Sequence, residues 1–544
     1  MLSACGSSSP SSPKPSPPVS GAPPAPPIPV PSAPPPVART PPAPEILPET
    51  LESTEFIITF AKSGDTAESL AARYLGSPAK GWMIEDYADA RSFTNGQAVV
   101  IPKRDWNPPG VYPSGYQLVP VLVYHNIAAQ RKGRLVIAAS VFEEHMRYLK
   151  REGYRAVRLE DFLAHVQHAR QLPKKSVLLT FDDGHKGFLE YAHPLLKELG
   201  FPAVLFTQTA QISGRPNPSF LSWPELRDLV RDGVEVQAHS KTHRHLKRAA
   251  GETDGDYARR MQTELGEPLD LLRKQLPRPR HGLETVAYPY GEWDEDLLRY
   301  VKQYGYTAGF TVRRQANPAF VAVLKVNRSQ VFSDWTLDDF RKNLNTFQEQ
   351  NLILPGAAPV ATARRIVPPR SAAQGEPSLR ERLAALHNDR SEQLESLGSL
   401  RQALDERKVA LTINPADGVA QERRSRLENR IETEIAALMN EGLKLARRSP
   451  VEAGRHFLGA LALNPTSQTA FEALQNAAPA ARSLTHTVRL KDTAASLADL
   501  YYSDRSRSEI IEQANGLQPG APLTPGRLLA IPEIPGVPFL RPDR

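Results

Sequence analysis

Two short motifs near the middle of the chain contain side chains that could bind a metal ion. In the first, an apolar run ends in two adjacent carboxylates, Asp182 and Asp183. In the second, an apolar run leads to His239 and His243. On a helical turn this i, i+4 spacing places both imidazoles on one face, so they can bind a single ion. Because Cys5 is the only cysteine, any metal must use histidine and carboxylate ligands.

The chemistry that such ligands support is hydrolysis. Two neutral imidazoles and one carboxylate leave a divalent ion with a net positive charge and open positions, so bound water becomes acidic and a substrate carbonyl can be polarised. A second carboxylate beside the ion could accept the proton of the attacking water. Each motif also has a simpler interpretation, since Asp-Asp-Gly often forms a turn and many exposed histidine pairs bind nothing.

Two further segments end apolar strands in polar or aromatic residues. Residues 286–291 run from a strand into a Pro-aromatic-Gly turn that contains Tyr288, Pro289 and Tyr290. Residues 120–127 form an apolar strand that ends at His125, well before the first carboxylate motif. His125 is a candidate proton donor, and the alternative is a structural histidine at the end of a strand.

In this order the motifs resemble those of the NodB-homology polysaccharide deacetylases, carbohydrate esterase family four. The family motif TFDDG is matched at 180–184, and H-S/T-x-x-H is matched at 239–243. The resemblance implies that Asp183, His239 and His243 bind a divalent metal and that Asp182 is the general base. Zinc is the expected ion, with cobalt, nickel or manganese as alternatives. The backbone N–H of Tyr290 is expected to help hold the oxyanion.

The chain departs from the family in two places. Ala287 stands where the Arg-x-Pro-Tyr motif has the arginine that holds the base, and no histidine occurs in 323–328, where a late Leu-x-His motif is expected. The early histidine and the Ala-Tyr-Pro-Tyr segment instead resemble the circularly permuted branch that includes poly-N-acetylglucosamine deacetylases. In that branch the early histidine acts as the acid, which implies this role for His125.

A sugar-binding groove is expected beside these motifs. We expect Tyr288 and Pro289 to line it, and Trp223 and Trp293 could also line it, although tryptophans in such places are more often core residues. His245 is expected at the surface or behind the metal ligands.

The elements that position these residues alternate between apolar strands and helices such as 140–149 and 223–229. Such alternation predicts an α/β fold with a parallel sheet. The resemblance specifies a distorted (β/α)7-type barrel over residues 118–354, with the site at the carboxyl ends of the strands.

Residues 53–103 and 484–534 are similar to each other. Each is predicted to contain a strand, two helices and a final strand that closes at an Ile-Pro pair, 101–102 or 531–532. This order resembles the LysM module, a βααβ fold that binds N-acetylglucosamine-containing glycans such as peptidoglycan. The alternative is a pair of scaffold modules that bind no sugar.

Residues 377–480 are rich in Leu, Ala, Glu and Arg at helical spacing. An Asn-Pro pair follows an apolar run at 414–415 and again at 464–465. These segments look like degenerate tetratricopeptide-type hairpins, whose expected role is spacing or docking of a protein partner.

Residues 1–50 are rich in proline and serine and are predicted to form an extended linker. Residues 2–6 resemble a bacterial lipobox, which implies a lipid anchor at Cys5 and export as a lipoprotein to the periplasmic side of a membrane or to the cell surface. The alternative is a disordered tail without an anchor. The net charge of +7 is spread along the chain, which argues against nucleic-acid binding.

Together these features predict metal-dependent removal of N-acetyl groups from a GlcNAc-containing polysaccharide, peptidoglycan or poly-N-acetylglucosamine, in the bacterial cell envelope, with release of acetate. One alternative is a catalytically inactive glycan-binding scaffold. Another is a metal amidohydrolase that acts on a small molecule or a peptide, which the glycan-binding modules disfavour.

Overall fold

The computed structural model describes residues 50–213, 217–277, 284–352, 377–477, 483–534 and 537. The chain divides into residues 1–45 and residues 46–544, and all described residues lie in the second unit. The lipid anchor predicted at Cys5 and the linker before residue 50 lie outside the described residues. Within the described part, no helix combines the length and the apolar character needed to span a membrane.

The largest sheet has parallel strands in the order β14-β13-β12-β11-β10-β6-β15, and the short strand β9 pairs beside β10. A bridge between Phe310 and Val326 joins the end of β14 to the segment that leads into β15, which itself pairs with β6. The strands therefore form a distorted barrel, which confirms the predicted fold class. The strands are β6 (Val121–Tyr124), β9 (Arg155–Ala156), β10 (Ser176–Phe181), β11 (Val204–Thr207), β12 (Glu235–Ala238), β13 (Thr285–Ala287), β14 (Ala308–Phe310) and β15 (Ser329–Gln330).

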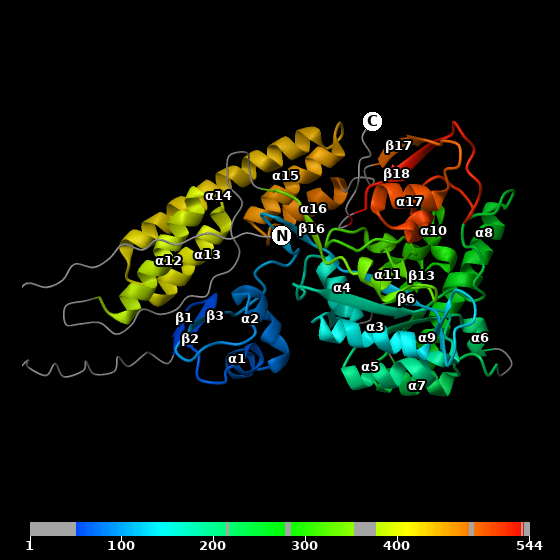
Figure 1. Ribbon diagram of the computed structural model, residues 1–544, viewed down its shortest axis with the longest axis horizontal. Coiled ribbons are helices and arrows are strands. Elements are labelled where there is room, and N and C mark those ends of the chain that lie inside the picture. The colour runs from blue at the N-terminus through cyan, green and yellow to red at the C-terminus, as the bar shows by residue number, and fades with distance from the viewer. Residues whose placement is uncertain are drawn as a thin grey trace, which may run out of the picture. The chain divides into compact units, whose positions relative to one another are not determined.

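Helices surround this sheet (Figure 1). Their starts follow from local sequence: Ser222 and Glu225 form a capping box at α7, and the Asp294 side chain accepts a hydrogen bond from the Leu297 N–H at α10. The helices are α3 (Ala139–Arg151), α4 (Leu159–Val166), α5 (His193–Leu199), α6 (Thr209–Ser213), α7 (Trp223–Arg231), α8 (Asp254–Met261), α9 (Glu267–Gln275), α10 (Glu295–Gln303) and α11 (Leu337–Lys342).

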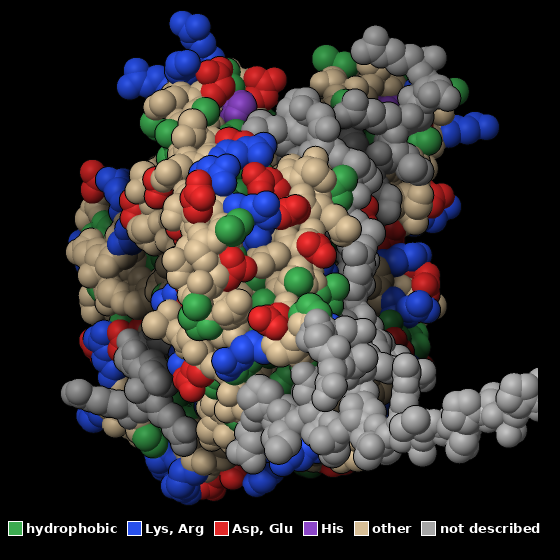
Figure 2. Space-filling view, turned by 90° about the vertical axis from the view of Figure 1, so that its left-hand side faces the viewer, with side chains coloured by type: hydrophobic (Ala, Val, Ile, Leu, Met, Phe, Trp, Pro, Cys, Tyr) green, Lys and Arg blue, Asp and Glu red, His purple; other side chains and the backbone are tan. Residues whose placement is uncertain are grey.

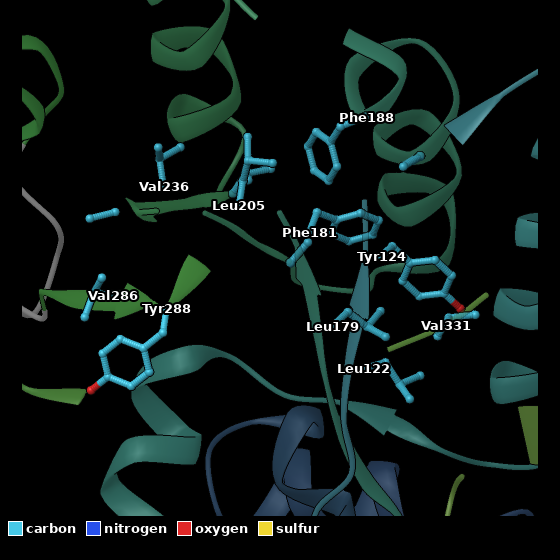
Figure 3. Packing of buried hydrophobic residues seen from close by; sticks show 14 of the residues in the cluster. Leu122, Tyr124, Leu179, Phe181, Phe188, Leu205, Val236, Val286, Tyr288 and Val331 are labelled. Atoms are coloured by element: carbon cyan, nitrogen blue, oxygen red, sulfur yellow. The ribbon is translucent and has the colours of Figure 1, made fainter. Parts of the chain in front are cut away.

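Alternate residues of the strands enter different apolar clusters. Tyr124 and Phe181 belong to the cluster under the surrounding helices, where their rings stack at 5.4 Å and Phe188 packs against Phe181 (Figure 3). Leu178 and Phe310 belong to a second cluster, to which α4 contributes. This period of two follows from the pleat of a strand, and it leaves Asp182 on the side of the second cluster.

The two predicted LysM-like modules both show the βααβ order. The first contains β2 (Phe56–Phe60), α1 (Ala67–Tyr74), α2 (Gly81–Ala88) and β3 (Ala98–Pro102), and an additional strand β1 (Thr50–Glu52) extends its sheet. The second contains β17 (Ser483–Thr487), α17 (Ala494–Tyr502), α18 (Ser508–Ala514) and β18 (Leu528–Pro532). In both, a capping box of threonine and serine starts the first helix.

The segment between the barrel and the second module is helical. Asn414 and Asn464 cap the ends of α13 and α15, where the Asn-Pro pairs predicted helix ends. Over the face shown in Figure 2, Lys and Arg side chains are interspersed with Asp and Glu. The helices are α12 (Leu379–Ser396), α13 (Leu400–Ile413), α14 (Gly418–Leu445), α15 (Pro450–Leu463) and α16 (Gln468–Ala477).

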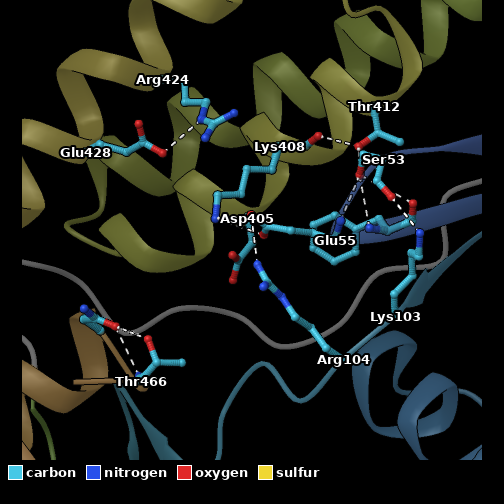
Figure 4. A network of polar contacts seen from close by, with 12 residues as sticks. Ser53, Glu55, Lys103, Arg104, Asp405, Lys408, Thr412, Arg424, Glu428 and Thr466 are labelled. Carbon is cyan, nitrogen blue, oxygen red and sulfur yellow. Dashed lines mark hydrogen bonds and ion pairs between the residues drawn. The ribbon is translucent and has the colours of Figure 1, made fainter. Parts of the chain in front are cut away.

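The first module packs against this helical segment. Phe56 and Ile58 of β2 share an apolar cluster with Leu383 of α12. Beside it, the Lys408 ammonium lies 2.9 Å from the Glu55 carboxylate, within the polar network in Figure 4. Smaller pairings complete the fold: β5 (Gly115–Gln117) with β4 (Val111–Tyr112) and β16 (Phe347–Glu349), and β7 (Asn126–Ala128) with β8 (Val136–Ala138).

Candidate metal centre and active site

The predicted site residues gather at the carboxyl ends of neighbouring strands. His125 directly follows β6, Asp182 and Asp183 follow β10, and His239 follows β12. Strand pairing fixes this arrangement, since the Asp182 N–H donates to the Tyr124 carbonyl. Because parallel strands end at the same edge, residues far apart in sequence become neighbours.

Asp183, His239 and His243 form a cluster that could hold a metal ion. One ligand atom from each residue lies within 4.8 Å of the others. Asp183 Oδ1 is 3.6 Å from His239 Nε2 and 3.8 Å from His243 Nε2. One carboxylate and two imidazoles are ligands that suit a divalent ion such as zinc. Burial lowers the pKa of His243, which favours the neutral imidazole that a metal requires.

The tautomer of His239 is set by the backbone. Its Nδ1 lies 2.8 Å from the Ala287 carbonyl oxygen, which can only accept, so Nδ1 carries the proton. The lone pair of Nε2 therefore faces Asp183. A hydrogen bond from the ring nitrogen that does not bind the metal typically orients a metal-binding histidine.

Asp183 is held by two side chains. Gln208 Nε2 donates to Oδ1 at 2.5 Å, and His185 Nε2 lies 3.5 Å from Oδ2. Burial raises the pKa of Asp183, but the hydrogen bond from His185 and the nearby imidazoles outweigh burial and hold the pKa below its usual value. Asp183 is therefore a carboxylate at neutral pH, as a metal ligand must be.

Four residues of the site have a left-handed backbone although none is glycine. Their φ angles are 74° for Asp183, 62° for Ser240, 59° for His243 and 59° for Tyr290. Such conformations are strained for residues with a Cβ and are often found at functional sites. Here they turn the chain sharply after each strand, which directs the side chains toward one point.

Asp182 is clamped by an arginine that the sequence analysis did not assign. The guanidinium of Arg328 donates to both carboxylate oxygens at 2.7 Å, and its Nε donates to the Thr311 carbonyl at 2.8 Å. Burial raises the pKa of Asp182. The charge of Arg328, and after it that of His239, lowers the pKa by more than burial raises it, so the net shift is downward. Asp182 Oδ2 lies 3.8 Å from His239 Nε2, so the ionised carboxylate adjoins the ligand cluster.

Arg328 thus contacts the carboxylate that the family arginine, absent at Ala287, is expected to hold. Residues 323–328, where the family places a late histidine, end at this arginine instead. The sequence carries no clear signal for it, because Arg328 lies between the polar residues Asn327 and Ser329, and its complete burial against Asp182 is evident only in the fold.

His125 lies at the end of β6 and is partly buried. Its Nε2 is 3.5 Å from Gln330 Nε2. Burial lowers the pKa of His125, an effect that the carboxylates of Asp182 and Asp183 partly oppose. A lower pKa makes the imidazolium form a stronger acid.

The expectation for Tyr288 is wrong. Its ring is fully buried in the cluster under the surrounding helices, and its hydroxyl donates to the Leu324 carbonyl at 2.9 Å. The neighbouring Pro289 is also buried. Neither residue can line an open groove, because the pleat directs the Tyr288 side chain into the core.

The two tryptophans also pack on the core. Trp223 donates to Ser213 at 3.3 Å, and Lys325 lies 4.0 Å from the centre of the Trp293 ring. Within the described residues, no contact joins either indole to Asp183 or to the histidines.

Tyr290 forms the exposed rim of the site. Its side chain is 53% exposed, its ring stacks on His245 at 4.3 Å, and its edge contacts His243 at 4.7 Å. His245 in turn lies 2.9 Å from Glu292, which places it at the surface behind a ligand.

Comparison with known proteins identifies two domains. Residues 169–309 match the family described as polysaccharide deacetylase, and residues 486–532 match the LysM domain. YxkH of Bacillus subtilis (strain 168), a predicted polysaccharide deacetylase, is 25% identical over 194 residues, which cover 36% of this chain and 64% of the relative. The poly-beta-1,6-N-acetyl-D-glucosamine N-deacetylase of Staphylococcus aureus (strain MRSA252) is 26% identical over 184 residues, which cover 33% of this chain and 62% of the relative.

The matched region thus spans less than two thirds of either relative. Among solved structures, the Streptococcus pyogenes deacetylase PplD in complex with acetate is 22% identical with a TM-score of 0.38, and covers 42% of this chain and 99% of that chain. By its sequence matches, this chain carries a domain of the polysaccharide deacetylase family at residues 169–309, followed by a LysM domain at residues 486–532.

Proposed function

We propose that the barrel domain is a metal-dependent deacetylase that removes N-acetyl groups from a GlcNAc-containing polysaccharide of the bacterial cell envelope and releases acetate. The observation that carries this proposal is the placement of two carboxylates beside the same histidine, His239. Asp183 faces two imidazoles, and Asp182, held ionised by Arg328, lies 3.8 Å from one of them.

In this mechanism Asp183, His239 and His243 hold the divalent ion, most simply zinc. When bound, such an ion makes water acidic and polarises the acetamide carbonyl. Asp182 accepts a proton from the attacking water, and Arg328 fixes the direction in which the carboxylate points.

Two further groups complete the reaction. The backbone N–H of Tyr290 donates to the carbonyl oxygen as negative charge develops there. His125 then donates a proton to the nitrogen of the breaking C–N bond, so the sugar leaves as an amine and the acetyl group as acetate.

The substrate class follows from the two domains together. The Staphylococcus aureus relative is named as acting on poly-β-1,6-N-acetylglucosamine, and the LysM domain supports binding of a GlcNAc polymer such as peptidoglycan. Both polymers lie outside the cytoplasm, which supports a location in the cell envelope. A lipid anchor at Cys5 and a protein partner on the helical segment belong to the same proposal.

The experiment is acetate release from purified peptidoglycan and from poly-N-acetylglucosamine. We expect release with added zinc, loss on chelation, and loss in Asp183→Ala. Asp270→Ala is the matched control, because the side chain of this aspartate in the first turn of α9 is exposed. Absence of acetate from both polymers, with zinc bound at one ion per chain, contradicts the proposed substrate class.

The alternative of an inactive glycan-binding scaffold loses its main support in the structure. It depended on Ala287 and on the missing late histidine. Arg328 now contacts the base, and His125 stands at the end of the strand next to it in the sheet. If the purified protein retained no metal, the inactive glycan-binding scaffold would be the better supported function.

A further inference from the structure

A groove opens beside the metal-binding cluster. It is lined by residues 242–245, 247–249, 260, 290 and 292 and has a volume of about 680 Å³. His243 and Tyr290 belong both to this lining and to the rim of the site. A glycan whose acetamido sugar reaches the metal centre therefore extends past these residues into the groove, which we call the basic groove.

Four cationic side chains line the basic groove, and two of them are neutralised by carboxylates. Arg248 lies 2.7 Å from Asp254 and 3.2 Å from Asp296, and Arg260 lies 2.7 Å from Glu252. Both arginines also cover the Tyr257 ring. These contacts shape the wall of the groove and leave little positive charge for a ligand.

The other two cations, Arg244 and Lys247, are exposed. Among the described residues, neither side chain forms a hydrogen bond or an ion pair, and the one acidic lining residue, Glu292, is paired with His245. The groove therefore presents two uncompensated cations next to a metal ligand, His243, that directly precedes Arg244.

We propose that the basic groove binds a carboxylate carried by the sugar next to the one that is deacetylated. The preferred substrate is then an acidic glycan, such as a strand in which N-acetylglucosamine alternates with a sugar whose lactyl carboxyl is free of peptide, rather than a neutral homopolymer. A guanidinium and an ammonium together suit a carboxylate through charge-assisted hydrogen bonds. This inference rests on the proposed function and narrows its substrate.

The test compares strands that carry the lactyl carboxylate with the same strands in which it is amidated, and uses a neutral homopolymer as a reference. We would measure kcat/KM for acetate release from alternating GlcNAc–MurNAc strands, from the same strands with each lactyl carboxylate converted to a methyl amide, and from neutral poly-N-acetylglucosamine oligomers. We expect the charged strands to be preferred over the amidated strands by about tenfold at low salt, and the preference to shrink at high salt.

The variant Arg244→Gln with Lys247→Gln should lose this preference and keep its rate on the neutral oligomers. The matched control is Lys274→Gln with Lys302→Gln, which removes two exposed lysines from the last turns of α9 and α10. The control should retain the full preference, and both double variants should keep the thermal midpoint of the parent protein.

Equal rates on charged and amidated strands would overturn the inference while leaving the deacetylase proposal intact. A double variant that slows on all three substrates alike would also overturn it. If the parent protein releases no acetate, binding of charged and amidated strands by the zinc-loaded chain still decides the point by calorimetry. Equal affinities would then reject the groove, and tighter binding of the charged strands would support it.

Discussion

The two ends of the barrel strands are built from different kinds of contact. At the carboxyl end, Asp182 and Arg328 form an ion pair with almost no exposed surface, and four non-glycine residues have a left-handed backbone. At the amino end, Arg155 and Lys174, which precede β10, contact Glu85 and Asp86 of the first module at a partly exposed surface.

The comparison separates chemistry from stability. Buried charges and strained turns lower stability unless they are matched, so they are expected where a reaction needs them. The amino end instead adjoins a module whose sheet is covered by an apolar helix face, which contributes burial without chemistry. Variants at the carboxyl end should therefore change activity first, and variants on the module side should change stability first.

The largest expected effect is at Asp182. Asp182→Asn should lower kcat by about a thousandfold, because the amide cannot accept the proton of water. Bound zinc, measured by atomic absorption, should remain near one ion per chain, since the three ligands are intact. Loss of the metal together with the activity would show that Asp182 acts as a ligand instead.

The next effect is at Arg328. Arg328→Met should lower kcat by about a hundredfold and destabilise the fold by roughly 3 to 5 kcal/mol, because it leaves a buried carboxylate without its partner. Arg328→Lys keeps the charge but loses the fork that contacts both oxygens, so an intermediate kcat is expected. A normal kcat in Arg328→Met would break the proposed link between the clamp and the base.

On the module side, Leu383 provides the contrast. Leu383 is 1% exposed in the cluster shared by β2 and α12, so Leu383→Ala should lower the free energy of unfolding by about 2 to 4 kcal/mol. Leu386 on the same helix is 39% exposed, and Leu386→Ala should change the free energy of unfolding by less than about 0.5 kcal/mol. Acetate release below the unfolding transition should be unchanged in both variants. A loss of acetate release in Leu383→Ala alone would contradict the separation of activity from stability.

The smallest effect concerns pH at the amino end. Burial raises the pKa of Asp86 to about 6, although its contacts with Lys174 oppose the shift. Because the pKa of Asp86 is higher in the folded state, its protonation contributes fully to stability below the unfolded-state pKa of about 4. This contribution is lost as the pH rises through about 6. Asp86→Asn should therefore stabilise the protein by about 1 kcal/mol at pH 7.5, given partial exposure, and by nothing at pH 4.

Thermal midpoints of Asp86→Asn and the parent protein at several pH values would test this. Asp105→Asn is the control, because the Asp105 carboxylate likewise accepts a hydrogen bond from a backbone N–H, that of Gln171. If Asp86→Asn shifted the thermal midpoint by the same amount at pH 4 and at pH 7.5, the raised pKa of Asp86 would be contradicted.

The sequence predicted what local pattern controls. Apolar runs alternating with helices predicted an α/β fold with a parallel sheet, and the family resemblance added the barrel and the cluster of Asp183, His239 and His243. The βααβ order was predictable for both modules because each helix start carries a threonine-serine capping box. Whether these residues play the proposed roles stays a prediction until the experiments above are done.

Long-range contacts escaped prediction. Arg328 directly precedes β15, far along the chain from Asp182, and no local pattern predicts that the two residues pair. Tyr288 was expected to line a groove because aromatic residues often bind sugars, but its place in the pleat buries it. The additional strand β1 was also missed, since three residues are too few to show alternation.

Arg328 links the closure of the barrel to the state of the Asp182 carboxylate. Its neighbours form the seam of the barrel, where Val326 bridges to Phe310 and Ser329 pairs with Leu122. Until this seam is joined, Asp182 has no counterion and the buried carboxylate is drawn toward its protonated, non-basic form. On the proposed mechanism, full hydrolytic activity therefore requires the pairing of the last strand, so acetate release would report on barrel closure in refolding experiments.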